Sequence, residues 1–321
     1  MLYNAEQKKK FINYYAKSDV VAKQSESIFS RIGDIEEKYD VDLCCTCDKD
    51  KLLEMVGCIS SNRSTSTNWK LKMLQQYVRW CFGKVKNVSD EIFDISFEDV
   101  NDLYIKEHMA SDPKDMDSYL KSFLRSDDEI TIDIVYKCVL WMAYAGIKEN
   151  KMQQVKSADV DLDVVGDEFY ITSDDRSFPV PAIAHQTFKL CVELTEFNYS
   201  NPNYTKGDIK RDRIVGDELL RGVKSATKQY QLLTQAISKK AKDAKLNRRI
   251  SYRSAMLSGV FYRINKLEKK GMIDFQEEAI RFVGEKEYKL DKSNLTQAGM
   301  QNRIAKELRA DYELWKKVFK K

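Results

Sequence analysis

Residues 132–181 read IDIVYKCVLWMAYAGIKENKMQQVKSADVDLDVVGDEFYITSDDRSFPVP, and this stretch decides the fold class. Nearly every position from Ile132 to Ala145 is apolar, which predicts a helix that is buried on most sides and ends at the following glycine. Short strand-like runs at 160–165, 168–172 and 177–181 then surround a Gly-Asp turn. A buried helix followed by a small antiparallel sheet indicates an α+β domain.

Helical patterns flank this stretch on both sides. In the first hundred residues Leu71, Leu74, Val78 and Cys81 recur at three-and-four spacing, which predicts a small helical bundle with one helix over about 69–82. The expected fold class is mainly α with a small antiparallel β-sheet. Further helices are expected over 182–197, 216–246, 251–267 and 307–319.

The length predicts more than one domain. A chain of 321 residues exceeds a comfortable single core, so we expect two domains that could each fold alone. Polar residues after His108, including Asp112-Pro113-Lys114-Asp115, resemble a boundary. We therefore expect a helical domain at 1–107, a linker region at 108–128 and an α+β domain at 129–321.

The composition is that of a soluble protein. It has 43% hydrophobic and 32% charged residues, with only 12 Gly and 4 Pro. The N-terminus, MLYNAEQKKKF, lacks an apolar signal core, and no run approaches the roughly 18 apolar residues of a membrane span. We expect a cytoplasmic protein without a membrane partner.

Seven cysteines form an odd set, which does not suggest a disulfide framework. Cys44, Cys45 and Cys47 have metal-like spacing, but no histidine lies near them in sequence and no second cysteine pair follows. We expect no cofactor, and metal binding by the three cysteines is left open.

The charge is concentrated in one segment. The chain has a net charge of +4, whereas residues 219–253 hold ten basic residues against the single acid Asp243. Such an excess is typical of a polyanion site, because each neutralised phosphate releases counterions. A solvated helix face is the alternative. The candidate contacts in this segment are Lys224, Lys228, Lys239, Lys240, Lys245, Arg248, Arg249 and Arg253.

A second candidate site precedes the helix at 69–82. Hydroxyl residues in Asn62-Arg-Ser-Thr-Ser-Thr-Asn-Trp69 can cap that helix, so its free N–H groups and nearby cations would face one end. An ordinary capped surface helix is the alternative. The candidate contacts here are Arg63, Thr65, Thr67, Lys70 and Lys72.

The order of these elements resembles the tyrosine recombinase (phage integrase) family over nearly the whole chain. Residues 144–161 are similar to the family segment TGLRxxExxxLxxxDID, Arg176-Ser-Phe-Pro179 lies where the family has a KxRxVP strand, and Ile250-Ser-Tyr-Arg253 lies at its HxxR motif. The resemblance implies a helical core-binding domain followed by an α+β catalytic-like domain, closed around double-stranded DNA as a clamp.

The catalytic residues of that family are mostly replaced. The resemblance places Lys148 at the first arginine, Ile171 at the strand lysine and Ile250 at the histidine, and only Arg253 is retained. Lys148 keeps a charge for DNA contact but loses the bidentate fork of arginine. A later histidine is impossible, because both histidines of the chain precede Arg253. The acid/base groups of phosphoryl transfer are thus missing.

The expected function is sequence-specific double-stranded DNA binding without recombinase activity. The chain is similar to the degenerate integrase-like master repressors that maintain lysogeny in SPβ-like prophages. Three alternatives stay open: an active recombinase or topoisomerase with Tyr288 or Tyr312 as nucleophile, a module that binds an acidic protein, and an internal ion-pair role for Arg253. Self-association on DNA is also left open. The resemblance further implies a bacterial host, where DNA binding would associate the protein with the nucleoid.

Overall fold

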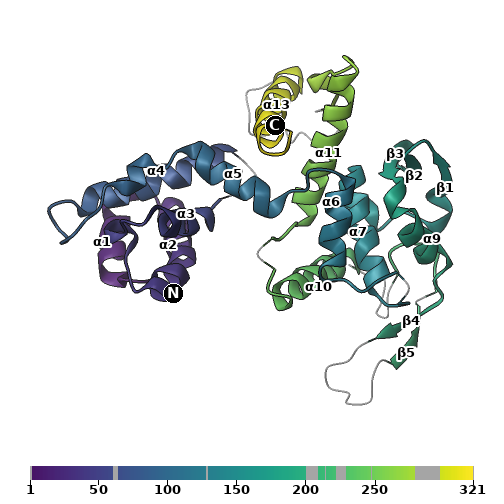
Figure 1. Cartoon of the computed structure of the whole chain (residues 1–321), viewed down its shortest axis with the longest axis horizontal. Helices are drawn as coiled ribbons and strands as arrows, with labels where there is room; N and C mark the ends of the chain where they lie inside the picture. Colours follow the sequence, from purple (N-terminus) through teal and green to yellow (C-terminus); the bar gives the residue numbers. More distant parts are fainter. Residues whose placement is uncertain are drawn as a thin grey trace. The chain divides into compact units, whose positions relative to one another are not determined.

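The computed structural model of the chain falls into two compact units (Figure 1). The N-terminal unit comprises Met1–Lys106 together with Glu313–Lys320, and the C-terminal unit comprises Glu107–Tyr312. Each unit is described by itself below. The structure describes residues 2–60, 64–127, 129–199, 209–213, 215–221, 229–246, 248–278 and 297–320.

The N-terminal unit is helical. Its core is aromatic: the ring of Phe29 lies 5.9 Å from Phe11 and 4.9 Å from Tyr77, centroid to centroid, both edge to face. Side chains cap the helices, as where Ser18 accepts a hydrogen bond from the Val21 N–H. The helices are α1 (Ala5–Tyr15), α2 (Asp19–Tyr39), α3 (Lys49–Gly57), α4 (Ser64–Cys81) and α5 (Phe97–His108), with 3-10 turns at Leu43–Cys45 and Glu91–Asp94.

Helix α4 begins five residues before the expected start at Trp69. The run Ser64–Asn68 has weak helix propensity, but Thr67 within it is fully buried, so tertiary packing extends the helix beyond its apolar pattern.

The C-terminal unit is built around α7 (Asp133–Ala145), all thirteen residues of which are buried. Gly146 ends this helix with φ at 99°, a left-handed conformation that favours glycine, so the predicted helix and its stop are confirmed. Around it lie α6 (Pro113–Lys121), α8 (Glu149–Met152), α9 (His185–Glu193), α10 (Gln229–Asp243) and α11 (Tyr252–Lys269). Helix α13 (Gln297–Phe319) is divided between the units after Tyr312.

Helix α6 lies within the segment 108–128, which was expected as a linker. Its Met116, Tyr119 and Leu120 are buried in the same core as α7. The segment is therefore part of the C-terminal unit, and the boundary between the units falls in the last turn of α5.

The expected three-stranded sheet is present. Strands β1 (Val160–Val165), β2 (Glu168–Ser173) and β3 (Arg176–Pro181) pair antiparallel in sequence order. Every second residue of β2 points inward, so Phe169 and Ile171 are fully buried.

Two expected helices are shorter than their patterns indicate. Helix α9 ends at Glu193, and Glu196–Tyr199 instead forms strand β4, paired with β5 (Ile209–Asp212). Residues 216–221 form bends around an isolated bridge between Glu218 and Lys156 rather than a helix, and the Leu219 N–H donates to the Val155 carbonyl at 2.8 Å. Buried Arg213 holds this region by donating to several backbone carbonyls, including that of Leu194 at 3.1 Å.

Among the described residues, no helix combines the length and the apolar character that crossing a membrane requires.

Candidate nucleic-acid interface

Only part of the site expected at the start of α4 can be evaluated. Arg63 lies outside the described residues, and the side chain of Thr65 is not described. Thr67 is fully buried, so this hydroxyl faces the core and not a phosphate, contrary to the expectation. Lys72 is exposed on α4.

Lys70 lies in a groove between α2 and α4. The groove has a volume of about 510 Å³ and is lined by Gln24, Ser27, Ile28, Arg31, Ser66, Trp69 and Lys70. The Lys70 ammonium donates to the Ile59 carbonyl at 2.8 Å. Burial lowers the pKa of Lys70, and the neighbouring positive charge of Arg31 lowers it further. Two cations therefore share a groove whose lining contains no acid, an arrangement that attracts anions.

Sequence reasoning missed Arg31, Gln24 and Ser27 in this groove. They lie on one face of α2 at helical spacing, but each is a common exposed residue in a mixed-charge helix. Only the packing of α2 against α4 places Arg31 near Lys70, so no local signal could have identified it.

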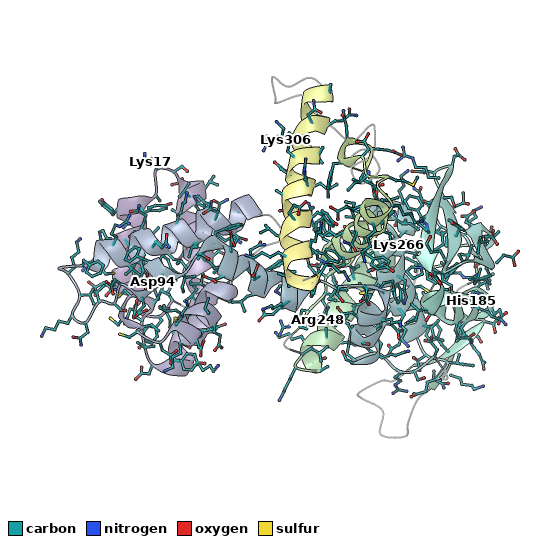
Figure 2. The ribbon with its side chains drawn as sticks, turned by 45° about the horizontal axis from the view of Figure 1, so that its top comes forward. Lys17, Asp94, His185, Arg248, Lys266 and Lys306 are labelled. Carbon is teal, nitrogen blue, oxygen red and sulfur yellow. The ribbon has the colours of Figure 1, made fainter. Side chains whose placement is uncertain are left out.

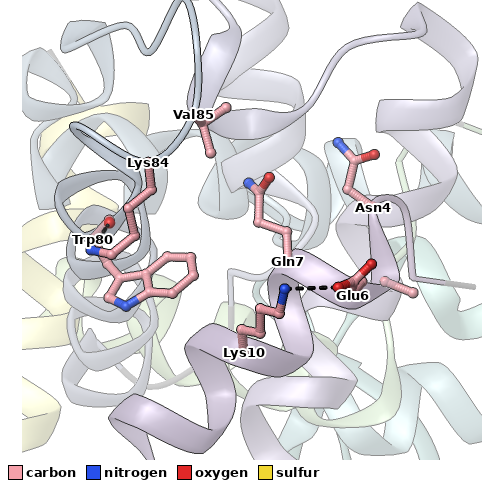
Figure 3. A pocket seen from close by; sticks show the side chains of 8 residues that line it. Asn4, Glu6, Gln7, Lys10, Trp80, Lys84 and Val85 are labelled. Carbon is pink, nitrogen blue, oxygen red and sulfur yellow. Dashed lines mark hydrogen bonds and ion pairs between the residues drawn. The ribbon is translucent and has the colours of Figure 1, made fainter.

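A second groove in the N-terminal unit has a different character (Figure 3). It is lined by residues of α1 and the end of α4, and its cations already have partners. Lys10 pairs with Glu6 at 2.7 Å, and Lys84 lies over the ring of Trp80, 4.7 Å from the centroid. The groove between α2 and α4 is the better anion site of the two.

In the C-terminal unit, the structure brings together the segments that contain Lys148 and Arg253. The Tyr252 hydroxyl, next to Arg253, donates to the carbonyl of Ile147, next to Lys148, at 2.9 Å. Arg253 is exposed on the first turn of α11, and Lys148 is half-buried at the start of α8. Lys148 and Arg253 thus lie on two segments that are joined by this hydrogen bond.

Two of the predicted contacts are held by acids within the unit. Arg248, which is labelled in Figure 2, binds the Asp115 carboxylate with two hydrogen bonds of 2.6 and 2.7 Å, and Lys240 contacts Asp133 at 2.5 Å. Burial acts to raise the pKa of Asp115, but hydrogen bonds from Arg248 and Ser111 outweigh it and lower the pKa. Arg248 and Lys240 therefore have acidic partners within the unit, while their side chains remain 29% and 39% exposed.

The remaining described candidates of the basic segment are exposed: Lys239, Lys245 and Arg249. The backbone at Arg249 is fixed, since its N–H donates to the Glu107 carbonyl at 2.8 Å and its own carbonyl lies 2.9 Å from His108 Nδ1. Lys224 and Lys228 lie outside the described residues.

Two of the positions that correspond to catalytic residues in the resembled family are apolar here. Ile250 is 3% exposed and Ile171 is fully buried, so both serve the core. Tyr312 is also fully buried; its hydroxyl donates to Glu268 Oε2 at 2.6 Å and accepts from Asn265 at 3.1 Å. This hydroxyl faces a structural network, and Tyr288 lies outside the described residues.

The cysteines expected near a metal site differ in exposure. Cys44 is buried, Cys45 is half-buried and Cys47 is exposed. Within the part of the chain that the structure describes, no group of three or more histidine, cysteine or acidic residues is arranged to hold a metal ion.

Comparison with known families gives one match. Residues 2–83 match the family described as MrpR, N-terminal core-binding domain. This stretch contains α1 to α4 and therefore the groove between α2 and α4. The match supports a recombinase-type fold and interaction with DNA. No curated protein matches the chain.

Proposed function

We propose that this chain is a sequence-specific double-stranded DNA-binding protein on a recombinase scaffold, without recombinase activity, that represses phage genes and maintains lysogeny. The observation that carries the proposal is the exposed basic segment of α10 and α11, next to a position where a buried isoleucine replaces the proton-transferring histidine of the resembled family. Phosphate contacts survive such a replacement, whereas proton transfer does not.

The two units would contribute different contacts. In the N-terminal unit, the groove between α2 and α4 offers Arg31 and Lys70 to a phosphate and Gln24 to a base edge, since arginine and glutamine can both read bases in the major groove. In the C-terminal unit, Lys239, Lys245 and Arg249 would bind the backbone.

A genome-wide selection of bound fragments, followed by denaturing gels of the selected site with the protein, tests the proposal. A recurrent sequence without a covalent product is the expected result. A covalent adduct that disappears in the Tyr288→Phe variant would instead establish an active recombinase. Failure to select any sequence would rule out specific recognition.

The exposed cations of the C-terminal unit predict a strong dependence of DNA affinity on salt. Replacing Lys239, Lys245 and Arg249 by glutamine should make the slope of log affinity against log salt shallower by about 3, since each phosphate contact contributes about 0.9. Titrations between 50 and 200 mM salt, about the range over which such contacts act, measure the slope. Lys189→Gln, an exposed control on α9, should leave it unchanged. Equal slopes for the triple variant and the wild type would contradict this interface.

Arg31 in the groove between α2 and α4 predicts a loss of affinity of about tenfold on replacement by glutamine, because an arginine contact to a base or phosphate is lost. Competition titration with the selected site measures the change. Lys10→Gln in the other groove is the matched control, since Lys10 is already paired with Glu6. If both variants bind like the wild type, the groove does not contact DNA.

A further inference from the structure

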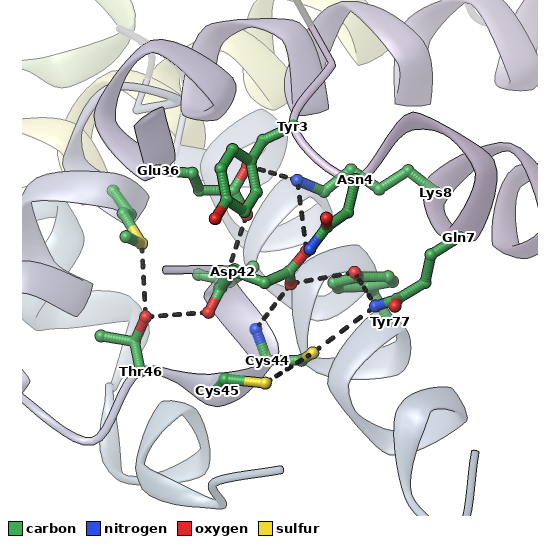
Figure 4. A network of polar contacts seen from close by, with 12 residues as sticks. Tyr3, Asn4, Gln7, Lys8, Glu36, Asp42, Cys44, Cys45, Thr46 and Tyr77 are labelled. Atoms are coloured by element: carbon green, nitrogen blue, oxygen red, sulfur yellow. Dashed lines mark hydrogen bonds and ion pairs between the residues drawn. The ribbon is translucent and has the colours of Figure 1, made fainter. Parts of the chain in front are cut away.

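Three charged side chains are buried together in the N-terminal unit (Figure 4). Lys8 of α1 contacts the carboxylate of Glu36 at the end of α2, and its ammonium lies 3.7 Å from Asp42 Oδ2. Lys8 and Glu36 are fully buried and Asp42 is 5% exposed. One ammonium thus faces two carboxylates, and the fully ionised cluster has a net charge of −1. An unbalanced buried charge is costly, and one proton would remove it.

The two carboxylates accept different numbers of hydrogen bonds from the described residues. Asp42 accepts hydrogen bonds from the Tyr77 hydroxyl at 2.9 Å, the Cys44 N–H at 3.0 Å and the Asn4 amide at 3.0 Å. Besides Lys8, the hydrogen-bond donor to Glu36 among the described residues is the Leu43 N–H at 2.8 Å. Hydrogen bonds to the charged form favour ionisation, so Glu36 is the carboxylate that takes up the proton.

Electrostatics agree with this assignment. Burial raises the pKa of Glu36 to about 7, against the opposing effect of Lys8 and with a further increase from Asp42. A carboxyl group that ordinarily ionises near pH 4.5 therefore changes charge around neutral pH in the folded chain.

Four other titratable groups near the cluster keep one charge state in this range. Tyr3 precedes α1, Tyr77 lies on α4, Cys44 lies in the turn after α2, and Cys58 follows α3. Burial is the first cause that raises the pKa of Tyr3, Tyr77 and Cys58, and for Cys44 it is the hydrogen bond with Cys81. All four stay protonated near neutral pH.

Cys81 at the end of α4 differs from these four, because its hydrogen bond with Cys44 lowers the pKa of its thiol. This thiol lies 3.5 Å from the side-chain amide of Gln7. The Glu36→Gln variant and the carboxyl titration described below therefore separate the proton of Glu36 from that of Cys81.

We propose that Glu36 is a proton-binding site that works as a latch for helix α1. With the proton bound the cluster is neutral and α1 is held closed; when the proton is lost, the unbalanced charge favours release of α1. The latch acts on α1 because this helix and the residue before it contact both carboxylates and one of their donors: Lys8 contacts Glu36, Asn4 contacts Asp42, and Gln7 donates to the Tyr77 hydroxyl at 2.6 Å.

The direction of the effect follows from linkage. The folded-state pKa of Glu36 lies above its unfolded value, so the stabilisation is fully present below about pH 4.5 and is lost as pH rises through about 7. Release of α1 would also affect α4, which carries both Tyr77 and Lys70. A weaker affinity for DNA at high pH would follow, and this last consequence alone rests on the proposed function.

Hydrogen exchange of the full chain without DNA tests the latch. The protection factors of the α1 amides, corrected for intrinsic rates, should fall about tenfold between about pH 6 and about pH 8 in the wild type. Linkage requires a change of this size for a carboxyl group whose pKa is 4.5 in the unfolded chain and about 7 in the folded chain. Glu36→Gln, which mimics the protonated form, should make the protection independent of pH. Glu37→Gln, an exposed neighbour on α2, should behave like the wild type.

A carboxyl NMR titration of Glu36 in the wild type provides a second measurement that needs no variant. A midpoint near neutral pH supports the proposal, and a midpoint near that of a free glutamate overturns it. Constant α1 protection between the two pH values in the wild type also overturns it. Because neither readout involves DNA, failure of the latch and failure of the proposed DNA binding are distinguishable.

Discussion

Replacing Gly259 by alanine is expected to prevent the C-terminal unit from folding normally. Gly259 lies on α11 where this helix crosses α7, and a Cβ atom there would lie 1.7 Å from the Tyr144 carbonyl oxygen. The obstacle is backbone, in a helix whose thirteen residues are all buried, so neither partner can move without opening the core. We expect a loss of more than about 3 kcal/mol, above the usual cost of overpacking.

Urea denaturation followed by circular dichroism measures this loss. Gly57→Ala is the matched control: a Cβ there meets only Leu103 Cδ1 at 3.7 Å, an ordinary contact, and alanine favours the helix. The control should be neutral or slightly stabilising. A Gly259→Ala variant with the wild-type midpoint would show that α7 and α11 do not cross so closely.

Replacing Lys8 by methionine is expected to cost the N-terminal unit about 3–5 kcal/mol, because it removes one partner of a buried ion pair and leaves two carboxylates facing each other. The loss should be smaller at acidic pH, where Glu36 is protonated and needs no partner. Denaturation at several pH values measures both effects.

The double variant Lys8→Met with Glu36→Gln should recover part of that stability, because it removes the second charge together with the first. Lys10→Met, an exposed change on the same helix, should leave the midpoint unchanged. If Lys8→Met and Lys10→Met denature alike, the ammonium of Lys8 does not stabilise the fold.

Local sequence patterns were sufficient to predict an element where the residues of that element alone define its periodicity. The continuous apolar run of α7, the glycine that ends it and the alternation in β2 each have a periodicity that only one structure satisfies, so the helix and the three strands agree with the sequence. The patterns were insufficient at residues 216–221, because the carbonyl that the Leu219 N–H bonds there, that of Val155, lies more than sixty residues away.

The basic residues could be counted from the sequence, but the sequence did not show which of them are paired with acids. The basic segment at 219–253 was evident, yet Arg248 and Lys240 proved to be paired with Asp115 and Asp133, which are more than a hundred residues distant. A cation is available to DNA only if the fold brings no carboxylate to it, and that depends on packing between remote elements.

By itself, the sequence determined the helical character of the chain, the small sheet and the local excess of positive charge, since these depend on residue type and short-range periodicity. Only the tertiary structure decided that Lys8 in a run of three lysines is buried against two acids, and that Arg31 and Lys70 share one groove. The reason is physical: burial and long-range electrostatics are set by which helices pack together, and no short stretch of chain contains that information.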